Sequence, residues 1–208
     1  MIIGNFPSGI AARVHVVDDD AAVRDAVSLL LSVAGYDVRA FPDAPALLES
    51  CTAQSRGCVI LDVHLPFMDG TSLQQELIER GIRMPVIFLS AHGNIPITVR
   101  TIKAGALDFL TKPVNPSVLL DRVAAAFEQD ARQQEMAEKA RLLSSRLESL
   151  TERERDVMRL AVAGCSNKEI ARHLGISHRT VEIHRSRVMQ KTGSTSLLDL
   201  VRVAAGAA

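Results

Sequence analysis

The chain has 208 residues, of which 47% are hydrophobic, and it carries 24 basic and 24 acidic side chains. This length suits one large domain or two modest ones, and the zero net charge gives no overall reason to expect binding to nucleic acid or membrane. The charge is nevertheless uneven. Residues 1–127 contain 10 basic and 13 acidic side chains, a net charge of −3, whereas residues 128–208 contain 14 and 11, a net charge of +3. Positive charge is therefore concentrated in the second part of the chain.

The cysteines and the apolar runs bear on where the protein resides. Cys51, Cys58 and Cys165 are odd in number and lack the spacing of a metal site, which indicates buried thiols in a reducing compartment. The first residues, MIIGNFPSGIAA, have no basic region and no long apolar core, so we expect no signal peptide. The sequence also lacks a run of about 18 apolar residues that could cross a membrane. We therefore expect a cytoplasmic protein with no membrane partner.

Short apolar runs and helical patterns alternate from residue 12 to residue 127. The apolar runs predict five strands: RVHVV, YDVRAF, GCVIL, PVIFL and LDFL. Helical patterns lie between and after them, at residues 21–34, 45–50, 73–80, 97–104 and 116–127. CVIL and VIFL lack polar alternation, as expected for strands buried on both faces. This order predicts an α/β domain with a doubly wound, five-stranded parallel sheet and helices on both of its faces.

The next segment, residues 128–148, contains neither glycine nor proline and begins as a highly polar stretch, which predicts a helical linker. Together with the preceding pattern it should form one long helix, or two nearly collinear ones, from Pro116 to about Ser149. Apolar residues recur in and just after it at a 4-3-4-3 spacing: Met136, Ala140, Leu143, Leu147 and Leu150. This spacing fits either a short coiled-coil seam or one side of a helix packed on a neighbouring domain, and the sequence leaves both alternatives open.

Residues 149–208 show only helical patterns, which predicts a small all-α domain. Two capping boxes mark helix starts, Thr151 with Glu154 and Ser166 with Glu169. A tight turn at residues 173–177 separates two of the helices, and the helix after the turn is basic. A helix, a turn and a basic second helix predict a helix-turn-helix. A last helix is expected from Ser196 to Ala204.

Polar side chains follow four of the predicted strands. Asp18 to Asp20 follow the first strand, Asp62 the third, Ser90 the fourth and Lys112 the fifth. Because the carboxyl ends of parallel strands meet at one edge of a sheet, these groups should lie close together. The carboxylates could hold a Mg2+ ion, which prefers oxygen ligands and offsets their repulsion. One carboxylate could accept a phosphoryl group, whose oxygens Lys112 could neutralise; Asp20 is better suited to capping the next helix.

The pieces VVDDD, LDVHLPFMDG, LSA and KP resemble the receiver domain of two-component response regulators, which has the CheY-like fold. The resemblance implies that Asp62 is the phosphoacceptor and that Lys112 and Ser90 assist it. It also implies a Mg2+ ion, with these ligands: Asp18, Asp19, Asp62 and the backbone carbonyl of His64. A protein of this kind takes its phosphoryl group from a sensor histidine kinase.

The resemblance carries two further expectations for the receiver domain. Ser90 and Phe109 should form the switch that responds to phosphorylation. The peptide bond between Lys112 and Pro113 should be cis, which a proline tertiary amide permits at low cost. The domain would assist its own phosphorylation and dephosphorylation without being an enzyme.

The stretch from Leu150 to Gly193, LTERERDVMRLAVAGCSNKEIARHLGISHRTVEIHRSRVMQKTG, resembles the LuxR/FixJ-type DNA-binding domain of NarL-like regulators. It implies that residues 177–192 form a recognition helix and that promoter DNA is a partner. Basic side chains on and near this helix are candidates for phosphate contacts: Lys168, Arg185, Arg187 and Lys191. Candidates for contacts with base edges are Arg179, Glu182, Ile183 and Ser186. An exposed isoleucine at position 183 would suit a thymine methyl group in the major groove.

Together the two resemblances are those of a FixJ-like response regulator, a phosphoacceptor transcription factor. We therefore expect a receiver at residues 12–127, a helical linker at 128–148 and a DNA-binding domain at 149–208. Phosphorylation should produce a homodimer through the face of the fourth receiver helix and the fifth strand. The candidate contacts on that face are Val99, Arg100, Lys103 and Asp108. RNA polymerase is a further candidate partner.

Two other functions are less consistent with the sequence. A Mg2+-dependent phosphohydrolase would carry its nucleophile after the first strand in a D-x-D arrangement followed by Thr or Val, whereas Ala21 follows Asp18-Asp19-Asp20 here. The C-terminal domain would also be unexplained in such an enzyme. A DNA-binding protein with an inactive receiver would lack some acceptor or metal residues, whereas every such position is filled here.

Overall fold

The computed structural model describes residues 12–91 and 95–205. Its contacts divide the chain into two compact units, residues 1–133 and 134–208. Among the helices in the described ranges, none combines the length and the hydrophobicity needed to span a lipid bilayer.

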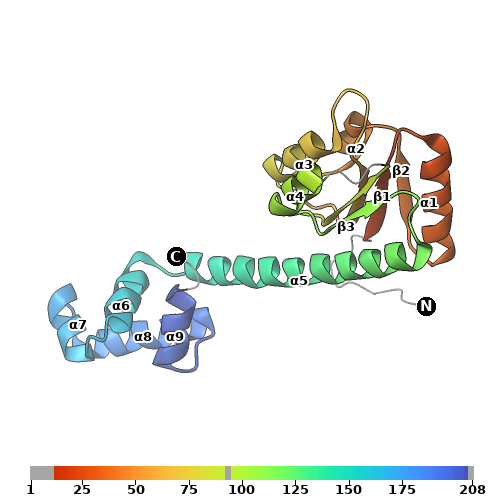
Figure 1. The fold of residues 1–208 in the computed structure, drawn as a ribbon. Helices are drawn as coiled ribbons and strands as arrows, with labels where there is room; N and C mark the ends of the chain where they lie inside the picture. The colour runs from red at the N-terminus through yellow and green to blue at the C-terminus, as the bar shows by residue number, and fades with distance from the viewer. Residues whose placement is uncertain (1–11, 92–94, 206–208) are drawn as a thin grey trace. The chain divides into compact units, whose positions relative to one another are not determined.

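The first unit is built on a five-stranded parallel sheet (Figure 1). Its strands are β1 (Arg13–Val17), β2 (Val38–Phe41), β3 (Gly57–Asp62), β4 (Val86–Ser90) and β5 (Asp108–Thr111). The strand order is β2-β1-β3-β4-β5, and each neighbouring pair is parallel. The predicted doubly wound sheet is therefore confirmed. The order changes direction between β1 and β3, which is where such sheets place their ligands.

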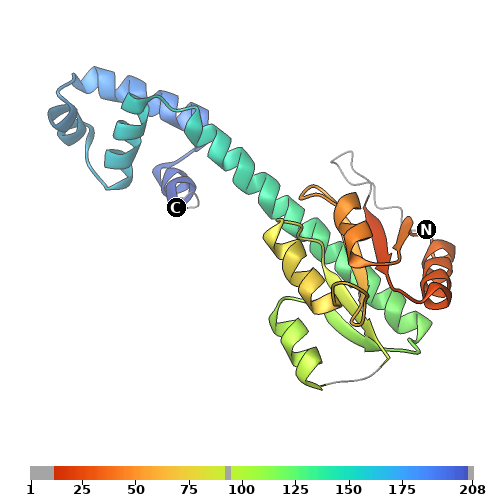
Figure 2. The same cartoon turned by 90° about the horizontal axis from the view of Figure 1, so that it is seen from above.

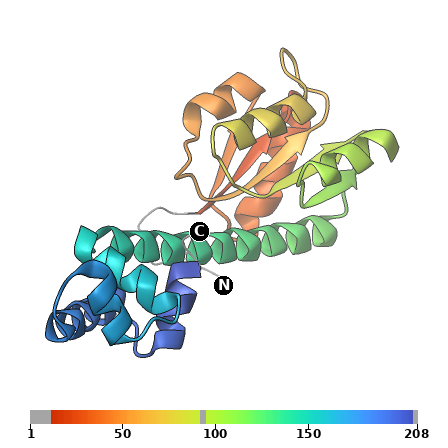
Figure 3. The ribbon, with the colours of Figure 1, turned by 90° about the vertical axis from the view of Figure 1, so that its left-hand side faces the viewer.

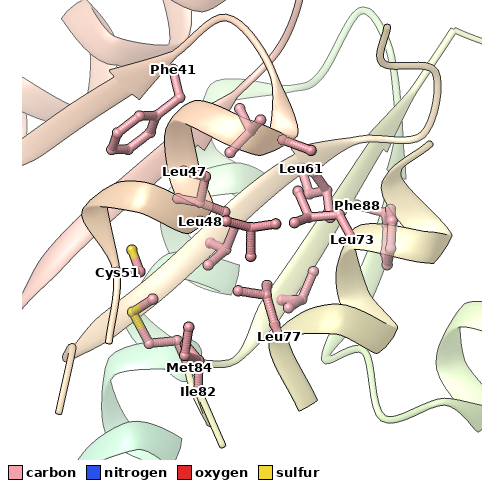
Figure 4. Packing of buried hydrophobic residues seen from close by; sticks show 14 of the residues in the cluster. Phe41, Leu47, Leu48, Cys51, Leu61, Leu73, Leu77, Ile82, Met84 and Phe88 are labelled. Carbon is pink, nitrogen blue, oxygen red and sulfur yellow. The ribbon is translucent and has the colours of Figure 1, made fainter. Parts of the chain in front are cut away.

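Helices cover both faces of this sheet, as Figures 1 and 2 show. One face carries α1 (Ala21–Val33) and the first part of α5 (Pro116–Glu148), whose apolar residues share a core cluster with the strands. The other carries α2 (Ala44–Ser50), α3 (Gly70–Glu79) and α4 (Ile95–Lys103). Figure 4 shows the second core, in which Leu47 and Leu48 of α2 and Leu73 and Leu77 of α3 pack on Leu61 of β3. These two cores hold the strand ends in fixed positions.

Helix α5 is a single helix of 33 residues, which confirms the prediction of one long helix. Leu119, Val123 and Ala126 are buried in the first core, so the helix begins as part of the sheet domain. Asp130 is also buried, at 2% exposure, and its carboxylate lies 2.9 Å from Nη2 of Arg56, itself 6% exposed. The same carboxylate oxygen accepts from the backbone N–H of Gly57 at 3.3 Å. The polar segment expected to be a linker thus contains a residue fixed within the first unit.

In residues 134–205, the described part of the second unit, all regular secondary structure is helical (Figure 3): the end of α5 is followed by α6 (Glu152–Val162), α7 (Asn167–Leu174), α8 (His178–Thr192) and α9 (Leu197–Ala205). Both predicted capping boxes are present, at the starts of α6 and α7. Gly175 ends α7 in the left-handed region, at φ 64° and ψ 35°, and Ser177 caps α8. The predicted helix-turn-helix is therefore confirmed. Its core consists of Val157, Ala161, Ile170 and Val181.

The packing of Leu147 and Leu150 bears on the two arrangements predicted for the apolar series in and after α5. Leu150 is buried with Val188 and Leu200, and Leu147 packs against the same cluster. Met136, in contrast, is 71% exposed. The end of the series therefore packs inside the second unit, which favours the alternative of a helix side resting on a domain. The three remaining positions are too few for a coiled-coil seam.

Candidate functional site

The carboxyl ends of β1, β3, β4 and β5 bring together the polar groups singled out in the sequence. Asp18 and Ser90 are almost completely buried, and Asp62 is largely so. Asp62 pairs in register with Leu89 of β4, and the backbone N–H of Lys112 donates to the carbonyl of Ser90 at 2.8 Å. Neighbouring parallel strands thus bring residues from four separate segments to one edge of the sheet.

The acidic side chains at this edge converge. Ligand oxygens of Asp18, Asp19 and Asp62 all lie within 4.8 Å of one another, and Asp19 is the exposed member of the three. A set of carboxylate oxygens with an opening to solvent fits Mg2+, which takes oxygen ligands and retains several waters. The cluster is therefore typical of a Mg2+ site. His64 follows Asp62 in an exposed part of the loop after β3.

Lys112 joins two of these carboxylates. Its Nζ lies 2.7 Å from Oδ2 of Asp18 and 3.1 Å from Oδ2 of Asp62. Burial raises the pKa of the Asp18 carboxyl, and the hydrogen bond and charge of Lys112 oppose that rise without cancelling it. Burial also lowers the pKa of Lys112, but its hydrogen bonds to Asp18 and Asp62 outweigh burial, so the net shift is upward. The ammonium is therefore a fixed positive charge at neutral pH.

Hydrogen bonds to the backbone fix the loop that follows Asp62 at the end of β3. The backbone N–H of Gly70 donates to the carbonyl of Val63 at 2.9 Å, and Asp69 caps α3 by accepting from the N–H of Ser72 at 2.7 Å. Phe67 is almost fully exposed and adopts a φ of 66°, a conformation that few non-glycine residues take. The Lys112–Pro113 bond is cis, as expected.

Gly70 is needed because nothing larger fits beside Asp62. A Cβ at this position would lie 2.2 Å from the carbonyl oxygen of Asp62 and 3.1 Å from Cε1 of Phe88. Gly70→Ala should therefore push the backbone of Asp62 out of place. We expect a loss of about 3 kcal/mol in the free energy of unfolding, at the upper end for overpacking, together with slower phosphorylation. Denaturant titration and the phosphorylation rate test this, and Gln75→Ala, at an exposed position on the same helix, should change neither.

The candidate switch residues lie on adjacent strands. Ser90 ends β4, and Phe109 lies in β5, where its half-buried ring stacks on Phe88 with the centroids 6.2 Å apart. On α4, the candidate dimer residues Val99, Arg100 and Lys103 are exposed. The fourth dimer candidate, Asp108, already forms an ion pair with Nε of Arg122 at 2.6 Å.

Arg24 belongs to this site although sequence reasoning did not single it out. Its Nη1 donates to the backbone carbonyl of Asp18 at 2.7 Å and approaches that of Asp19 at 3.4 Å. Asp20 caps α1, as predicted, by accepting from the N–H of Ala22 at 2.9 Å. An arginine one turn into a helix is ordinary in a sequence, so its contact with the preceding loop becomes visible only in the fold.

In the second unit, α8 buries Val181 and Val188 and turns other side chains outward. Ile183 is 41% exposed, and several candidate DNA contacts are also exposed: Lys168, Arg179, Ser186 and Arg187. Glu182 is half-buried, and its carboxylate lies 3.2 Å from Nη1 of Arg179.

Two of the candidate phosphate contacts already have partners in the fold. Nη1 of Arg185 donates to Oδ1 of Asn167 at 2.7 Å. Nζ of Lys191 lies 2.7 Å from the carboxylate of Glu154, whose side chain is 3% exposed, and donates to the carbonyl of Ser149 at 3.0 Å. The hydrogen bond from Lys191 is also the main reason that the pKa of Glu154 is lowered. Lys191 therefore stabilises the fold of the unit.

A doubly wound sheet with this acidic edge, followed by a helix-turn-helix, defines the response-regulator class. Two family models match the chain: the response regulator receiver domain over residues 14–124, and the bacterial regulatory proteins of the luxR family over residues 148–204. The chain belongs to the two-component response regulators with a LuxR-type DNA-binding domain, a family of transcriptional regulators rather than enzymes.

Several relatives match over nearly the whole chain. The transcriptional regulatory protein TdiR of Thauera aromatica is 44% identical over 197 residues, covering 93% of this chain and 86% of that protein. The transcriptional regulatory protein FixJ of Bradyrhizobium diazoefficiens is 42% identical over 196 residues, covering 92% and 94%. Among solved structures, the response regulator StyR is 40% identical and gives a TM-score of 0.85, covering 93% of this chain and 98% of that one.

Proposed function

We propose that a sensor histidine kinase phosphorylates Asp62 and that this phosphorylation controls dimerisation and sequence-specific DNA binding. The observation that carries the proposal is the contact of Lys112 with both Asp18 and Asp62 at the open edge of the sheet. The proposed domains are a receiver at residues 12–127, a helical linker at 128–148 and a DNA-binding domain at 149–208. Promoter DNA is the proposed target, and RNA polymerase is a candidate partner once DNA is bound.

The chemistry proposed for the edge is nucleophilic transfer of a phosphoryl group. An oxygen of Asp62 forms the bond to phosphorus while the bond from phosphorus to the kinase histidine breaks, and the electron pair stays on the imidazole. Lys112 neutralises the phosphoryl oxygens, and the hydroxyl of Ser90 contacts one of them. A Mg2+ ion would add positive charge there, with these proposed ligands: Asp18, Asp19, Asp62 and the backbone carbonyl of His64.

The proposed switch transmits this change to a dimer face. Ser90 moves toward the phosphoryl group, and Phe109 follows into the space that it leaves. The movement reshapes the surface of α4 and β5, where Val99 offers apolar contact and Arg100 and Lys103 offer positive charge. Asp108 would reach a partner chain only by exchanging or sharing its ion pair with Arg122. A two-fold axis would let each of these contacts occur twice.

Sedimentation velocity tests this proposal on the full-length chain. The unphosphorylated protein should be mainly monomeric, and a phosphoryl mimic with Mg2+ should strengthen dimerisation about 5- to 150-fold, the range for couplings of ~1–3 kcal/mol. Arg100→Glu should weaken the dimer without changing phosphorylation. An unchanged sedimentation coefficient with the mimic bound would contradict the dimer switch, and equal loss of both properties in Arg100→Glu would mean that this residue acts through the fold.

The proposed contacts with DNA belong to side chains on and near α8. Ile183 and Ser186 project from α8 as candidates for base contacts, with Arg179 and Glu182 beside them. Phosphate contacts are proposed for four basic residues: Lys168, Arg185, Arg187 and Lys191. Two recognition helices in a dimer would match half-sites about one helical turn apart, which explains why dimerisation should strengthen DNA binding.

A further inference from the structure

The three carboxylates at the sheet edge are held in different ways. Asp18 accepts hydrogen bonds from Nζ of Lys112 at 2.7 Å and from the backbone N–H of Asp20 at 3.1 Å. Asp62 accepts from the same ammonium at 3.1 Å. Asp19 is exposed, yet its ligand oxygen lies within 4.8 Å of those of the other two residues. The position of the Asp19 carboxylate therefore depends mainly on the backbone that carries it.

Arg24 holds that stretch of backbone. Its Nη1 contacts two successive carbonyl oxygens, that of Asp18 at 2.7 Å and that of Asp19 at 3.4 Å. The loop is fixed from its other end by Asp20, which caps α1. Both contacts come from one nitrogen, whose N–H groups are held in the plane of the guanidinium, whereas a lysine ammonium is a single point charge on a flexible chain.

We propose that Arg24 is a positioning residue for Mg2+ binding, which holds the loop between β1 and α1 so that the Asp19 carboxylate converges with those of Asp18 and Asp62. This inference rests on the proposed metal site. Arg24 is also a positive charge near a cation site, and charge alone would weaken Mg2+ binding. Removal of the side chain should therefore weaken binding if positioning dominates and tighten it if charge dominates.

Isothermal titration of Mg2+ into the full-length chain, without a phosphodonor, separates these effects. Arg24→Lys keeps the charge and loses the planar guanidinium, and Arg24→Met loses both. We expect each variant to raise the Kd for Mg2+ about tenfold, at the low end of the ~10–100-fold range for groups that orient metal ligands. Arg80→Met, which removes an arginine paired with Glu76 on α3, is the matched control and should leave the Kd unchanged. Thermal unfolding in EDTA checks that each variant is folded.

Each outcome decides a different point. Weaker binding in both Arg24 variants, with normal binding in the control, supports the positioning role. An unchanged Kd in Arg24→Lys with tighter binding in Arg24→Met would show that Arg24 acts by charge alone. Wild-type affinity in both variants would show that Arg24 has no role in Mg2+ binding. Either result overturns the inference but leaves the proposed metal site in place. Failure of the wild-type chain to bind Mg2+ would overturn the proposed site and the inference with it.

Discussion

Asp62→Asn should abolish phosphorylation of the full-length chain and leave its fold intact. The amide is nearly the same size as the carboxylate and can still accept a hydrogen bond from Lys112, but it is not a nucleophile at neutral pH. After incubation with a small phosphodonor and Mg2+, the wild-type chain should gain one phosphoryl group in its intact mass and the variant none. The variant should also fail to dimerise.

The matched control for this variant is Asp25→Asn. Asp25 is an exposed carboxylate on α1, outside the acidic cluster, and its loss should leave phosphorylation at the wild-type level. Retention of one phosphoryl group in Asp62→Asn would mean that another residue is the acceptor. If Asp62→Asn unfolds much more easily than the wild-type chain, the substitution acts by destabilising the fold.

Asp130→Ala should destabilise the receiver by about 3–5 kcal/mol, the usual effect of removing one partner from a buried ion pair. The guanidinium of Arg56 would remain buried without the carboxylate that lies 2.9 Å from its Nη2, and the N–H of Gly57 would lose its acceptor. Denaturant unfolding of the full-length chain, followed by circular dichroism, measures this change as a shift of the receiver transition.

Asp37→Ala provides the comparison, because Asp37 pairs with Arg13 on the surface. Exposed pairs of this kind contribute only about 0–1 kcal/mol, so this variant should unfold almost as the wild type does. Similar decreases in the free energy of unfolding of the two variants would show that the buried ion pair of Asp130 stabilises the fold no more than the exposed pair of Asp37 does. Such a result would also contradict the conclusion that the start of the predicted linker is fixed in the first unit.

The candidate phosphorylation site could be predicted because its members lie at the carboxyl ends of four strands of one parallel sheet. Once Asp18, Asp62 and Lys112 are placed after parallel strands, sheet geometry alone brings them to one edge. The continuous helix α5 was predictable for a similar reason, since the segment lacks any residue that would end it. In both cases a local pattern, combined with a general rule of packing, determines the outcome.

Long side chains were harder to place from the sequence. Arg24 and Lys191 can each reach several acceptors, and the pattern of charges does not say which one the fold supplies. Asp130 lies 74 residues from Arg56 along the chain, so their ion pair depends on how α5 lies against the sheet. Leu147 and Leu150 fitted two packing arrangements equally well until Val188 and Leu200 were seen beside them.

The identity of the phosphorylated residue tests the central claim most directly. The wild-type chain would be phosphorylated by a small phosphodonor with Mg2+, the acyl phosphate would be trapped by borohydride reduction, and the modified peptide would be sequenced by mass spectrometry. We predict a single modification, at Asp62. Modification at Asp18 would contradict the response-regulator mechanism proposed for this edge and would favour an aspartate-nucleophile phosphohydrolase instead.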